Sequence, residues 1–357
     1  MINGKLKKQG AKPLYETLYD ELKKDVISGK IKRGEKMPSK RTLAERIGVS
    51  VITVDAAYRL LIDEGYVYSR ERSGFYAGNT GTERIGNNFA AYSVEERGAA
   101  DFDFRFSSFS KIMRKVITEY DRALLIKPPA FGCSELRKAI SGYLYRYRGM
   151  DVDYRNIIIG SGSEYFYGMI VALLGRNRIY GLEYPSYEKI SKVIETSGAK
   201  CEFLKMGENG ILAEELKKSK ATVLHITPFN SYPTGITADY LKRLEYIEWA
   251  KEQNGYIVED DIDSEFAVGA KPVETVYSLD GGKRVIYLNT FSRSIAPSMR
   301  MGYMVLPDDL LKEYKDKLGF YSCTVPAFDQ YVMAEFIDGG HFERHLNRRR
   351  RKLKEQN

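Results

Sequence analysis

The sequence predicts an α/β protein in two parts: a small helical module with a β-hairpin over residues 1–78, and a larger domain with a mostly parallel sheet over residues 104–357. Helical periodicity and turn signals alternate within the first eighty residues. Farther along, continuous apolar strands alternate with amphipathic helices, which is typical of a parallel sheet covered on both faces. Residues 79–103 contain Gly, Asn and charge without periodicity, as expected of a linker.

Charge divides the chain in the same way. Residues 1–80 contain 16 Lys and Arg against 10 Asp and Glu, and residues 341–357 contain 7 against 2, so the remainder carries −3 of the total +8. A basic N-terminal module on a slightly acidic body indicates a polyanionic partner for the module, although a solvated lysine surface explains the charge equally well. No apolar run suits a membrane span or a signal peptide. The three isolated cysteines suit reduced thiols rather than disulfides or a metal site, so we expect a cytoplasmic protein.

The first eighty residues predict three helices and a hairpin. The first helix has apolar residues at every fourth position, namely Leu14, Leu18, Leu22 and Val26. Ser39 caps a short second helix whose inner side carries Leu43, Ala44 and Ile47, and Gly48 supplies the turn after it. Ser50 caps a third helix, closed by Gly65, with four positions available for packing: Ile52, Ala56, Tyr58 and Leu60 or Leu61. The runs "YVYS" and "FYAG" then predict the two strands of a basic hairpin.

These residues resemble the winged helix-turn-helix DNA-binding domain of the GntR family. The matching motifs are Leu14-Tyr15, Ser28-Gly29 with Gly34, Pro38-Ser39-Lys40-Arg41-Thr42-Leu43-Ala44, Thr53-Val54-Asp55-Ala56-Ala57-Tyr58, Glu64-Gly65-Tyr66 and Ser73-Gly74. A three-helix module without DNA binding is the alternative. The resemblance implies that Arg41 and the start of the third helix face the major groove of double-stranded DNA, and that the hairpin enters the minor groove.

The expected DNA contacts follow from that placement. They are Ser39, Lys40, Arg41, Ser50, Thr53, Arg70, Arg72 and Gly74. Arginine side chains suit both guanine and phosphate. Val51 stands where the family often has arginine; it can touch a thymine methyl group but cannot donate to guanine. We therefore expect a shifted operator preference.

The larger domain has polar residues at the expected carboxyl ends of its strands, where parallel sheets carry function. Gly160-Ser161-Gly162-Ser163 opens a helix, an arrangement that binds phosphate but is more often a plain turn. Asp260, in "YIVEDDIDSEF", could hold the proton of a ring nitrogen, bind a metal or be solvated. The loop "TFSRSIAPSMR" adds hydroxyls and two cations at residues 290–300.

Together these residues resemble the type I aminotransferase fold, specifically the aminotransferase-like domain of the MocR-type regulators of the GntR family. The motifs are Gly132 with Leu136-Arg137, Gly160 to Ser163, Pro185 with Tyr187, Tyr232 to Gly235, Glu259 to Phe266, Thr290 to Ser292, Arg300 with Gly302-Tyr303, and Gly340 to His345. The resemblance implies a site for pyridoxal phosphate. Its phosphate would be held by Ser161, Gly162, Ser163, Thr290, Ser292 and Arg300, its ring stacked on Tyr187, and its nitrogen paired with Asp260.

Three departures from the family pattern change the expected function. Arg293 stands at the position of the lysine that forms the Schiff base, and a guanidinium remains charged and non-nucleophilic. Ile262 replaces a ring-side tyrosine. The chain ends in the basic stretch "HFERHLNRRRRKLKEQN", without the small C-terminal domain that such proteins add. We therefore expect no catalytic residue and only noncovalent pyridoxal phosphate, although Arg293 could instead be structural and pair with an acid such as Asp260 in an empty site.

The prediction is a homodimeric, DNA-binding transcription regulator whose aminotransferase-like domain dimerises and senses a small-molecule effector. One alternative is a pyridoxal-phosphate-dependent enzyme fused to a DNA-binding module, which needs the missing lysine. A decayed product that retains only fold and DNA binding is another.

Overall fold

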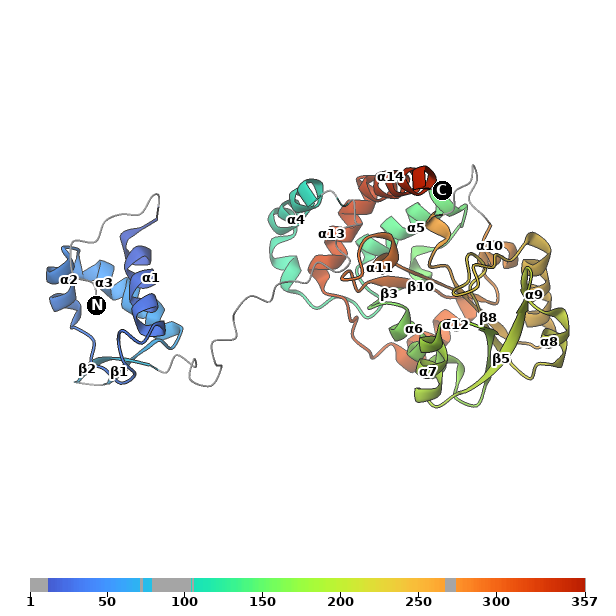
Figure 1. Cartoon of the computed structure of the whole chain (residues 1–357), viewed down its shortest axis with the longest axis horizontal. Helices are drawn as coiled ribbons and strands as arrows, with labels where there is room; N and C mark the ends of the chain where they lie inside the picture. The colour runs from blue at the N-terminus through green and yellow to red at the C-terminus, as the bar shows by residue number, and fades with distance from the viewer. Residues whose placement is uncertain (1–11, 71–72, 79–103, 105, 267–273, 357) are drawn as a thin grey trace. The chain divides into compact units, whose positions relative to one another are not determined.

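The computed structural model describes residues 12–70, 73–78, 104, 106–266 and 274–356, which belong to two compact units, Met1–Ala100 and Asp101–Asn357 (Figure 1). The linker expected at residues 79–103 lies outside the described residues. Each unit has its own hydrophobic core.

The N-terminal unit consists of three helices followed by a hairpin. They are α1 (Leu14–Ile27), α2 (Lys40–Ile47), α3 (Val51–Asp63), β1 (Val67–Arg70) and β2 (Gly74–Ala77). The strands pair antiparallel, with Val67 opposite Ala77 and Arg70 opposite Gly74. The helix-turn-helix with a β-hairpin wing is therefore confirmed.

The helix caps in this unit are those expected from the sequence. The hydroxyl of Ser39 accepts the backbone N–H of Thr42 at 3.1 Å, and that of Ser50 accepts the N–H of Thr53 at 3.1 Å. Each bond satisfies a donor that the first helical turn leaves open. Gly48 has φ +70°, a conformation that glycine adopts without strain, and it ends α2.

The packing face of α3 differs from the expectation. Val54, Ala57, Tyr58 and Leu61 are its buried residues. Ile52, expected in the core, is 80% exposed, because at about 100° per residue it lies on the face of α3 away from Val54 and Leu61. Leu14 of α1 is also exposed. The inner residues Leu43, Ala44 and Ile47 of α2 are buried as expected.

The larger unit is built on an eight-stranded mixed sheet of order β3-β10-β9-β8-β7-β4-β5-β6. The strands are β3 (Ile157–Gly160), β4 (Ile179–Tyr184), β5 (Lys200–Gly207), β6 (Gly210–Ile211), β7 (Val223–Ile226), β8 (Tyr256–Asp260), β9 (Val285–Thr290) and β10 (Gly302–Val305). β5, β4, β7, β8 and β9 run parallel; β10 is antiparallel to both β9 and β3, and β6 to β5. The mostly parallel sheet is thus confirmed.

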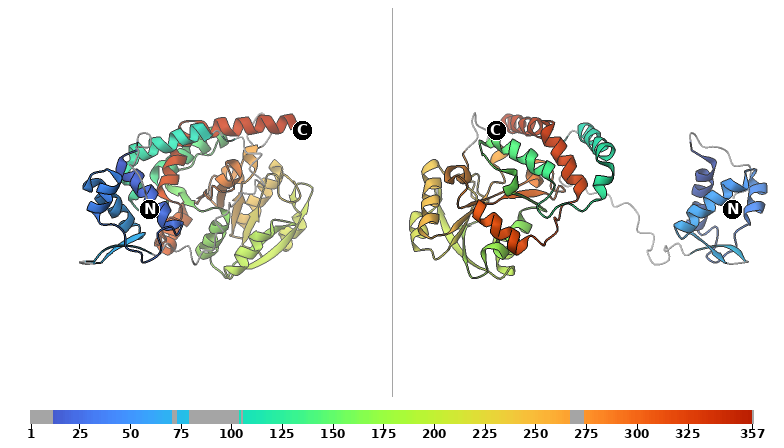
Figure 2. Two further views of the ribbon diagram at one scale, coloured as in Figure 1. Left: turned by 60° about the vertical axis from the view of Figure 1, so that its left-hand side comes forward. Right: turned by 180° about the vertical axis from the view of Figure 1, so that it is seen from behind.

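Helices cover both faces of this sheet, as Figure 1 and the two further views of Figure 2 show. One face carries α4 (Phe106–Tyr120), α5 (Ser134–Arg148), α8 (Ala213–Lys218), α9 (Tyr240–Glu252), α10 (Val276–Asp280), α13 (Ala327–Asp338) and α14 (His341–Gln356). The other face carries α6 (Ser163–Leu174), α7 (Glu188–Thr196) and α12 (Asp308–Leu318). Short segments complete the unit: η1 (Asp121–Leu125), η2 (Tyr154–Asn156), η3 (Ser264–Phe266) and α11 (Phe291–Ser294).

The continuous apolar strands are explained by this three-layer arrangement. Successive strand residues point to opposite faces of a sheet. Ile157 and Ile159 of β3 accordingly join the core under α5 and α13, whereas Ile158 joins the core under α6 and α12. Both faces are buried, so neither needs polar residues.

The strand register determines where the functional residues gather. Gly302, at the start of β10, is opposite Gly160 on one side and Thr290 on the other. A Cβ on Gly302 would lie 2.7 Å from the carbonyl oxygen of Asn289, so glycine permits this close approach. Asp260 ends β8 beside Leu288 of β9. Three polar segments separated in sequence therefore meet at one edge of the sheet.

Candidate functional site

The loop between β3 and α6 forms the centre of the candidate anion site. Gly162 has φ +110° and caps α6, so the backbone N–H groups of the first helical turn face the sheet edge. A Cβ on Gly162 would lie 3.2 Å from a terminal guanidinium nitrogen of Arg300, which places this cation directly against the loop. Ser161 and Ser163 flank the glycine. The structure thus brings together the first predicted phosphate residues and the arginine from the loop before β10.

The other two predicted phosphate residues belong to the end of β9 and to α11. Thr290 is buried, and its γ-methyl lies near Gly302. Ser292 donates its hydroxyl to the carbonyl of Met299 at 2.8 Å, which closes the loop before Arg300. Ser292 is therefore already bonded within the protein. Its assignment as a phosphate ligand remains a prediction.

Arg300 also faces an acid of the protein. A guanidinium nitrogen lies 3.8 Å from Glu164 of α6, and both side chains are about half exposed. Glu164 in addition accepts a bond from Lys189 at 3.2 Å. An exposed pair of this kind contributes little to stability, so an anionic ligand with better geometry can displace Glu164 from Arg300.

Asp260 lies in a buried polar cluster at the end of β8. One carboxylate oxygen accepts a hydrogen bond from the hydroxyl of Tyr167 and lies 3.8 Å from Nε2 of His225. The other oxygen is buried and has no hydrogen-bond partner among the described residues. Burying such an acceptor without a donor is costly, so this oxygen could accept a hydrogen bond from a bound group.

Tyr167 connects this carboxylate to the anion loop. Its hydroxyl is also hydrogen-bonded to the side chain of Ser163. Burial, followed by the charge of Asp260, raises the pKa of Tyr167 well above its usual range, so the phenol keeps its proton. Sequence reasoning missed Tyr167 and His225 as site residues. The available signal was spacing, since Tyr167 follows Ser163 by four residues on one face of α6.

Tyr187 precedes α7 at the same edge of the sheet. Its side chain is 45% exposed, and its ring meets that of Tyr232 edge-to-face with centroids 6.2 Å apart. Lys189 lies 5.8 Å from the Tyr187 ring. An exposed aromatic ring has the chemistry to stack on a planar ligand, and that role stays a prediction.

Arg293 pairs with a different acid from the one expected. Its Nε lies 2.7 Å from a carboxylate oxygen of Asp263, and its side chain is 61% exposed. Asp263 also accepts a bond from Asn230 at 3.0 Å. Pairing of Arg293 with a nearby acid is therefore confirmed, but the acid is Asp263 rather than the suggested Asp260, which is buried and bonded to Tyr167.

Several buried carboxylates lie in or just after the strands β4 and β8. Asp261 forms a buried ion pair with Arg148 at 2.6 Å and accepts the hydroxyl of Tyr287 at 2.6 Å. Desolvation raises the pKa of three further acids to about 7, and these are Glu183, Glu259 and Glu265. Glu183 accepts the hydroxyl of Ser231 at 2.7 Å. These bonds fix the strand ends that carry the site.

The N-terminal unit has its own candidate nucleic-acid surface. Arg41 is exposed and has no ion-pair or hydrogen-bond partner among the described residues. Arg70 lies over the ring of Tyr76 at 4.9 Å. Lys40 differs from the expectation of a free contact, because its ammonium group pairs with Asp55 and lies 5.0 Å from the Phe75 ring.

The remaining predicted contacts are structural in part. The side chains of Ser39 and Ser50 cap helices, and the Thr53 hydroxyl bonds to that of Ser50 at 2.8 Å. Gly74 has φ +112° at the start of β2. Arg72 lies outside the described residues. Sequence reasoning missed Ile52 as an exposed residue at the start of α3; the available signal was the two charged residues on its own face, Asp55 and Arg59, three and seven positions later.

Two further findings concern the whole chain. No helix in the described ranges is both long and apolar enough to cross a membrane. The three cysteines, Cys133, Cys201 and Cys323, form no disulfide.

Comparison with known proteins agrees with this two-part structure. Residues 14–77 match the family described as bacterial regulatory proteins, gntR family, and residues 98–357 match aminotransferase class I and II. The chain is 32% identical over 353 residues to the uncharacterized HTH-type transcriptional regulator YdeL of Bacillus subtilis, covering 95% of this chain and 76% of YdeL. It is 26% identical over 367 residues to the probable rhizopine catabolism regulatory protein MocR of Rhizobium meliloti, and the match covers 95% of this chain and 74% of MocR.

Among solved structures, the larger unit is similar to the kynurenine aminotransferase of Pyrococcus horikoshii. The TM-score is 0.63 at 26% identity, and the match covers 70% of this chain. The chain spans 64% of that enzyme's length. The comparison confirms the fold type I aminotransferase architecture of the larger unit.

Proposed function

The chain belongs to the transcriptional regulators that join a GntR helix-turn-helix to an aminotransferase class I and II domain, and on that premise we propose that it is a homodimeric regulator that binds promoter DNA and senses a phosphorylated ligand. One observation carries the proposal. The larger unit combines the anion loop and the buried Asp260 with an arginine, Arg293, in the loop where the resemblance to aminotransferases would put the lysine of the Schiff base. Such a site binds without reacting.

DNA binding is supported by the exposed start of α3 and by the cations of the N-terminal unit. Arg41, Val51 and Ile52 are all exposed on the helix-turn-helix. A helix presented in this way fits the major groove. Arg70 on the hairpin is positioned for phosphate. A protein with this role acts where the chromosome is, which is consistent with a cytoplasmic location.

The residues present fit pyridoxal phosphate. Its dianionic phosphate suits the N-terminus of α6 together with Arg300. Its protonated ring nitrogen is the kind of donor that the free oxygen of Asp260 lacks. In enzymes the bound group supplies an electron sink for chemistry at an amino acid. In this chain, Tyr167 holds the Asp260 carboxylate in place, and Tyr187 would cover the ring.

Arg293 directs this site toward recognition. A guanidinium does not lose its proton in proteins, so it can neither attack an aldehyde nor shuttle a proton. It can bind a carboxylate or phosphate through two parallel hydrogen bonds. The Arg293 side chain is exposed although Asp263 is largely buried, so a ligand carboxylate could reach the guanidinium from the solvent side. We infer noncovalent ligand binding without transamination.

Titration with pyridoxal phosphate tests this inference. Wild type is expected to bind reversibly and to retain no adduct after borohydride reduction, whereas Arg293→Lys is expected to retain one that peptide mapping locates at residue 293. Asp260→Asn is the matched control for site occupancy, and it should weaken binding in both backgrounds. A reduced adduct in wild type, on a lysine of this site, would favour the enzyme alternative.

DNA binding is tested separately with promoter fragments at several salt concentrations. The logarithm of the binding constant should fall steeply and linearly with the logarithm of salt, by about 0.9 for each phosphate contacted. Arg41→Gln should lower that slope by about one. Glu16→Gln, on α1, changes one surface charge of opposite sign and should leave the slope unaltered. Affinity that is independent of salt would contradict the proposal.

Dimerisation is supported by exposed apolar residues on the larger unit. Ile117 of α4 is 56% exposed, and Leu125 and Ile126 next to η1 are 88% and 68% exposed. Large apolar side chains that remain this exposed are typical of protein interfaces when they form a patch. Light scattering should give the mass of two chains. Leu125→Glu with Ile126→Glu should shift it to one chain, and a monomeric wild type would exclude the dimer.

A further inference from the structure

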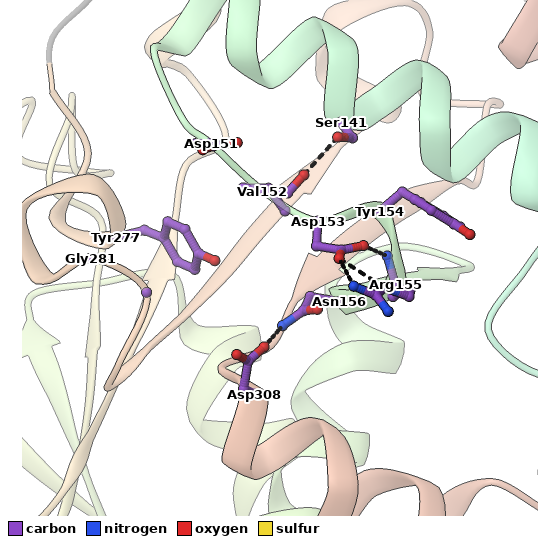
Figure 3. Close-up of a pocket in the computed structure, with 11 residues that line it drawn as sticks. Ser141, Asp151, Val152, Asp153, Tyr154, Arg155, Asn156, Tyr277, Gly281 and Asp308 are labelled. Atoms are coloured by element: carbon purple, nitrogen blue, oxygen red, sulfur yellow. Dashed lines mark hydrogen bonds and ion pairs between the residues drawn. The ribbon is translucent and has the colours of Figure 1, made fainter.

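A pocket of about 660 Å³ lies at the edge of the sheet away from the anion loop, between the α5–β3 connection, the α10–β9 turn and the start of α12 (Figure 3). Its three acids, Asp151, Asp153 and Asp308, are exposed to solvent. Two of them already accept hydrogen bonds within the chain, Asp153 from Arg155 at 2.8 Å and Asp308 from Asn156 at 2.6 Å. Exposed carboxylates are satisfied by water, so this pocket is an ordinary polar surface. The polar groups that the proposed function does not yet use lie on α14.

One face of the basic helix α14 is directed into the larger unit. Phe342 is fully buried on this face and packs edge-to-face against Phe291 of α11, with ring centroids 5.6 Å apart. His345, Arg349 and Arg350 follow Phe342 at intervals of three, seven and eight residues, which puts them on the same side of the helix. The buried ring therefore anchors α14, and the histidine and the two arginines are held near the polar segments that follow the strands.

Side chains of α14 cap the short helix α11, which carries Arg293. Nη1 of Arg349 donates to the carbonyl oxygens of Arg293 and Ser294, at 2.9 and 3.2 Å. Nε2 of His345 lies 2.9 Å from the same Ser294 oxygen. α11 has only four residues, so its last carbonyls have no partner within the helix, and a single isolated turn is unstable. The contacts from α14 therefore fix the backbone from which the Arg293 side chain extends.

Arg350 makes the corresponding contact to η3, the short helix that follows Asp263. Its Nε donates to the carbonyl oxygen of Glu265 at 2.6 Å. The two capped segments carry the two members of one ion pair, because Arg293 belongs to α11 and Asp263 directly precedes η3. α14 thus holds the backbone on both sides of the contact between Arg293 and Asp263.

We propose that Arg349 and Arg350 are positioning residues of the ligand site, which hold Arg293 where its guanidinium can meet an anionic group of the ligand. The inference rests on the proposed role of Arg293 in ligand binding. A long exposed side chain loses conformational entropy when it orders on a ligand, and a fixed backbone lowers that cost. Coupling of this kind is reciprocal, so a ligand that orders Arg293 also stabilises the contacts of α14. The basic helix is therefore the element that responds to occupation of the site.

Hydrogen exchange of the full chain, measured by mass spectrometry without ligand, tests the contacts themselves. Arg349→Met removes the donor but keeps a long side chain, and it should speed exchange in residues 290–298 about five- to tenfold, as expected for the loss of one or two hydrogen bonds. Arg349→Lys keeps a donor and should restore exchange to within about threefold of wild type. Arg351→Met is the matched control, because the Arg351 guanidinium bonds to the carbonyl of Asn347 within α14, and it should leave these residues unchanged.

The Arg293→Lys variant reports the position of residue 293 directly. Its amine condenses with the aldehyde of pyridoxal phosphate with loss of water, and borohydride reduces the product to a stable adduct that peptide mapping locates. Adding Arg349→Met should slow formation of this adduct about tenfold, because the amine must meet the aldehyde within a narrow range of positions. Adding Arg351→Met should leave the rate unchanged.

The outcomes separate positioning from general stability and from the proposed ligand. Unchanged exchange in Arg349→Met would overturn the proposal, and so would equal slowing of the adduct by Arg349→Met and Arg351→Met. Faster exchange in the core strand β8 as well as in residues 290–298 would show that Arg349 only stabilises the fold, and would also overturn it. If Arg293→Lys forms no adduct, the proposed ligand is wrong, whereas the exchange measured without ligand still decides the role of Arg349.

Discussion

Replacing Ile52 with alanine should remove a specific contact between α3 and thymine without harming the fold. Ile52 is the second residue of α3 and is 80% exposed, so almost none of its side chain packs in the module. Alanine is at least as good a helix former, and the free energy of unfolding should change by less than about 0.5 kcal/mol. The change therefore isolates the interaction with DNA.

The magnitude follows from the exposed side chain. If Ile52 covers a thymine methyl group, the contact buries roughly 40–60 Å² of apolar surface, which at about 25 cal/mol per Å² gives about 1–1.5 kcal/mol. That corresponds to about a five- to tenfold change in the dissociation constant. The salt dependence should not change, because isoleucine carries no charge.

A double-mutant cycle with modified DNA measures this contact. An operator obtained by selection is labelled, and each thymine is replaced in turn by deoxyuridine, which lacks only the methyl group. Wild type should lose about five- to tenfold in affinity at the contacted position, whereas Ile52→Ala should bind both duplexes equally. Fluorescence anisotropy provides the dissociation constants.

Ile27→Ala is the matched control, since Ile27 ends α1 and is 43% exposed. It should retain the full sensitivity to deoxyuridine. The reasoning is refuted if Ile52→Ala remains as sensitive as wild type at every thymine of the operator. If wild type binds no DNA at all, the proposal that this protein is a DNA-binding regulator is wrong.

Three further predictions concern the larger unit. Arg148→Met leaves Asp261 buried without its cation and should lower the free energy of unfolding by about 3–5 kcal/mol, measured by denaturant titration. Tyr167→Phe removes a donor from Asp260 and should cost about 1–3 kcal/mol in the same assay. Calorimetry should show a melting temperature that falls between pH 5 and 8, because Glu183, Glu259 and Glu265 have a pKa of about 7 in the folded state and an ordinary pKa of 4.5 in the unfolded chain. The folded state therefore holds protons that the unfolded chain has released, and this stabilisation is complete below pH 4.5 and is lost as pH rises through about 7. A melting temperature that rises over this range would contradict the assignment to these three acids.

Much of the candidate site could be predicted because its residues are adjacent in sequence to the ends of recognisable strands. The run "NIIIGSGS" places a glycine turn directly after a buried strand, and the structure confirms that this turn opens α6. Periodicity also identified the helices that cover the sheet. Asp260 was found in the same way, as a carboxylate at the end of β8.

The partners of these residues could not be predicted, since they come from segments far apart in the chain. Arg293 pairs with Asp263 rather than Asp260. Asp260 is buried and bonded to Tyr167 of α6, a helix far from it in sequence. Lys40 is held by Asp55 of the next helix.

The sequence by itself determined the two-part organisation, the helix caps and the order of strands and helices, because these depend on local periodicity and on residues such as Ser39, Ser50 and Gly162. Only the tertiary structure decided which groups are left without partners. The free oxygen of Asp260 results from packing between distant segments, and no local pattern encodes that burial. Ile52 differs from the buried Val54 for the same reason, since what covers a helix position depends on the neighbouring helices.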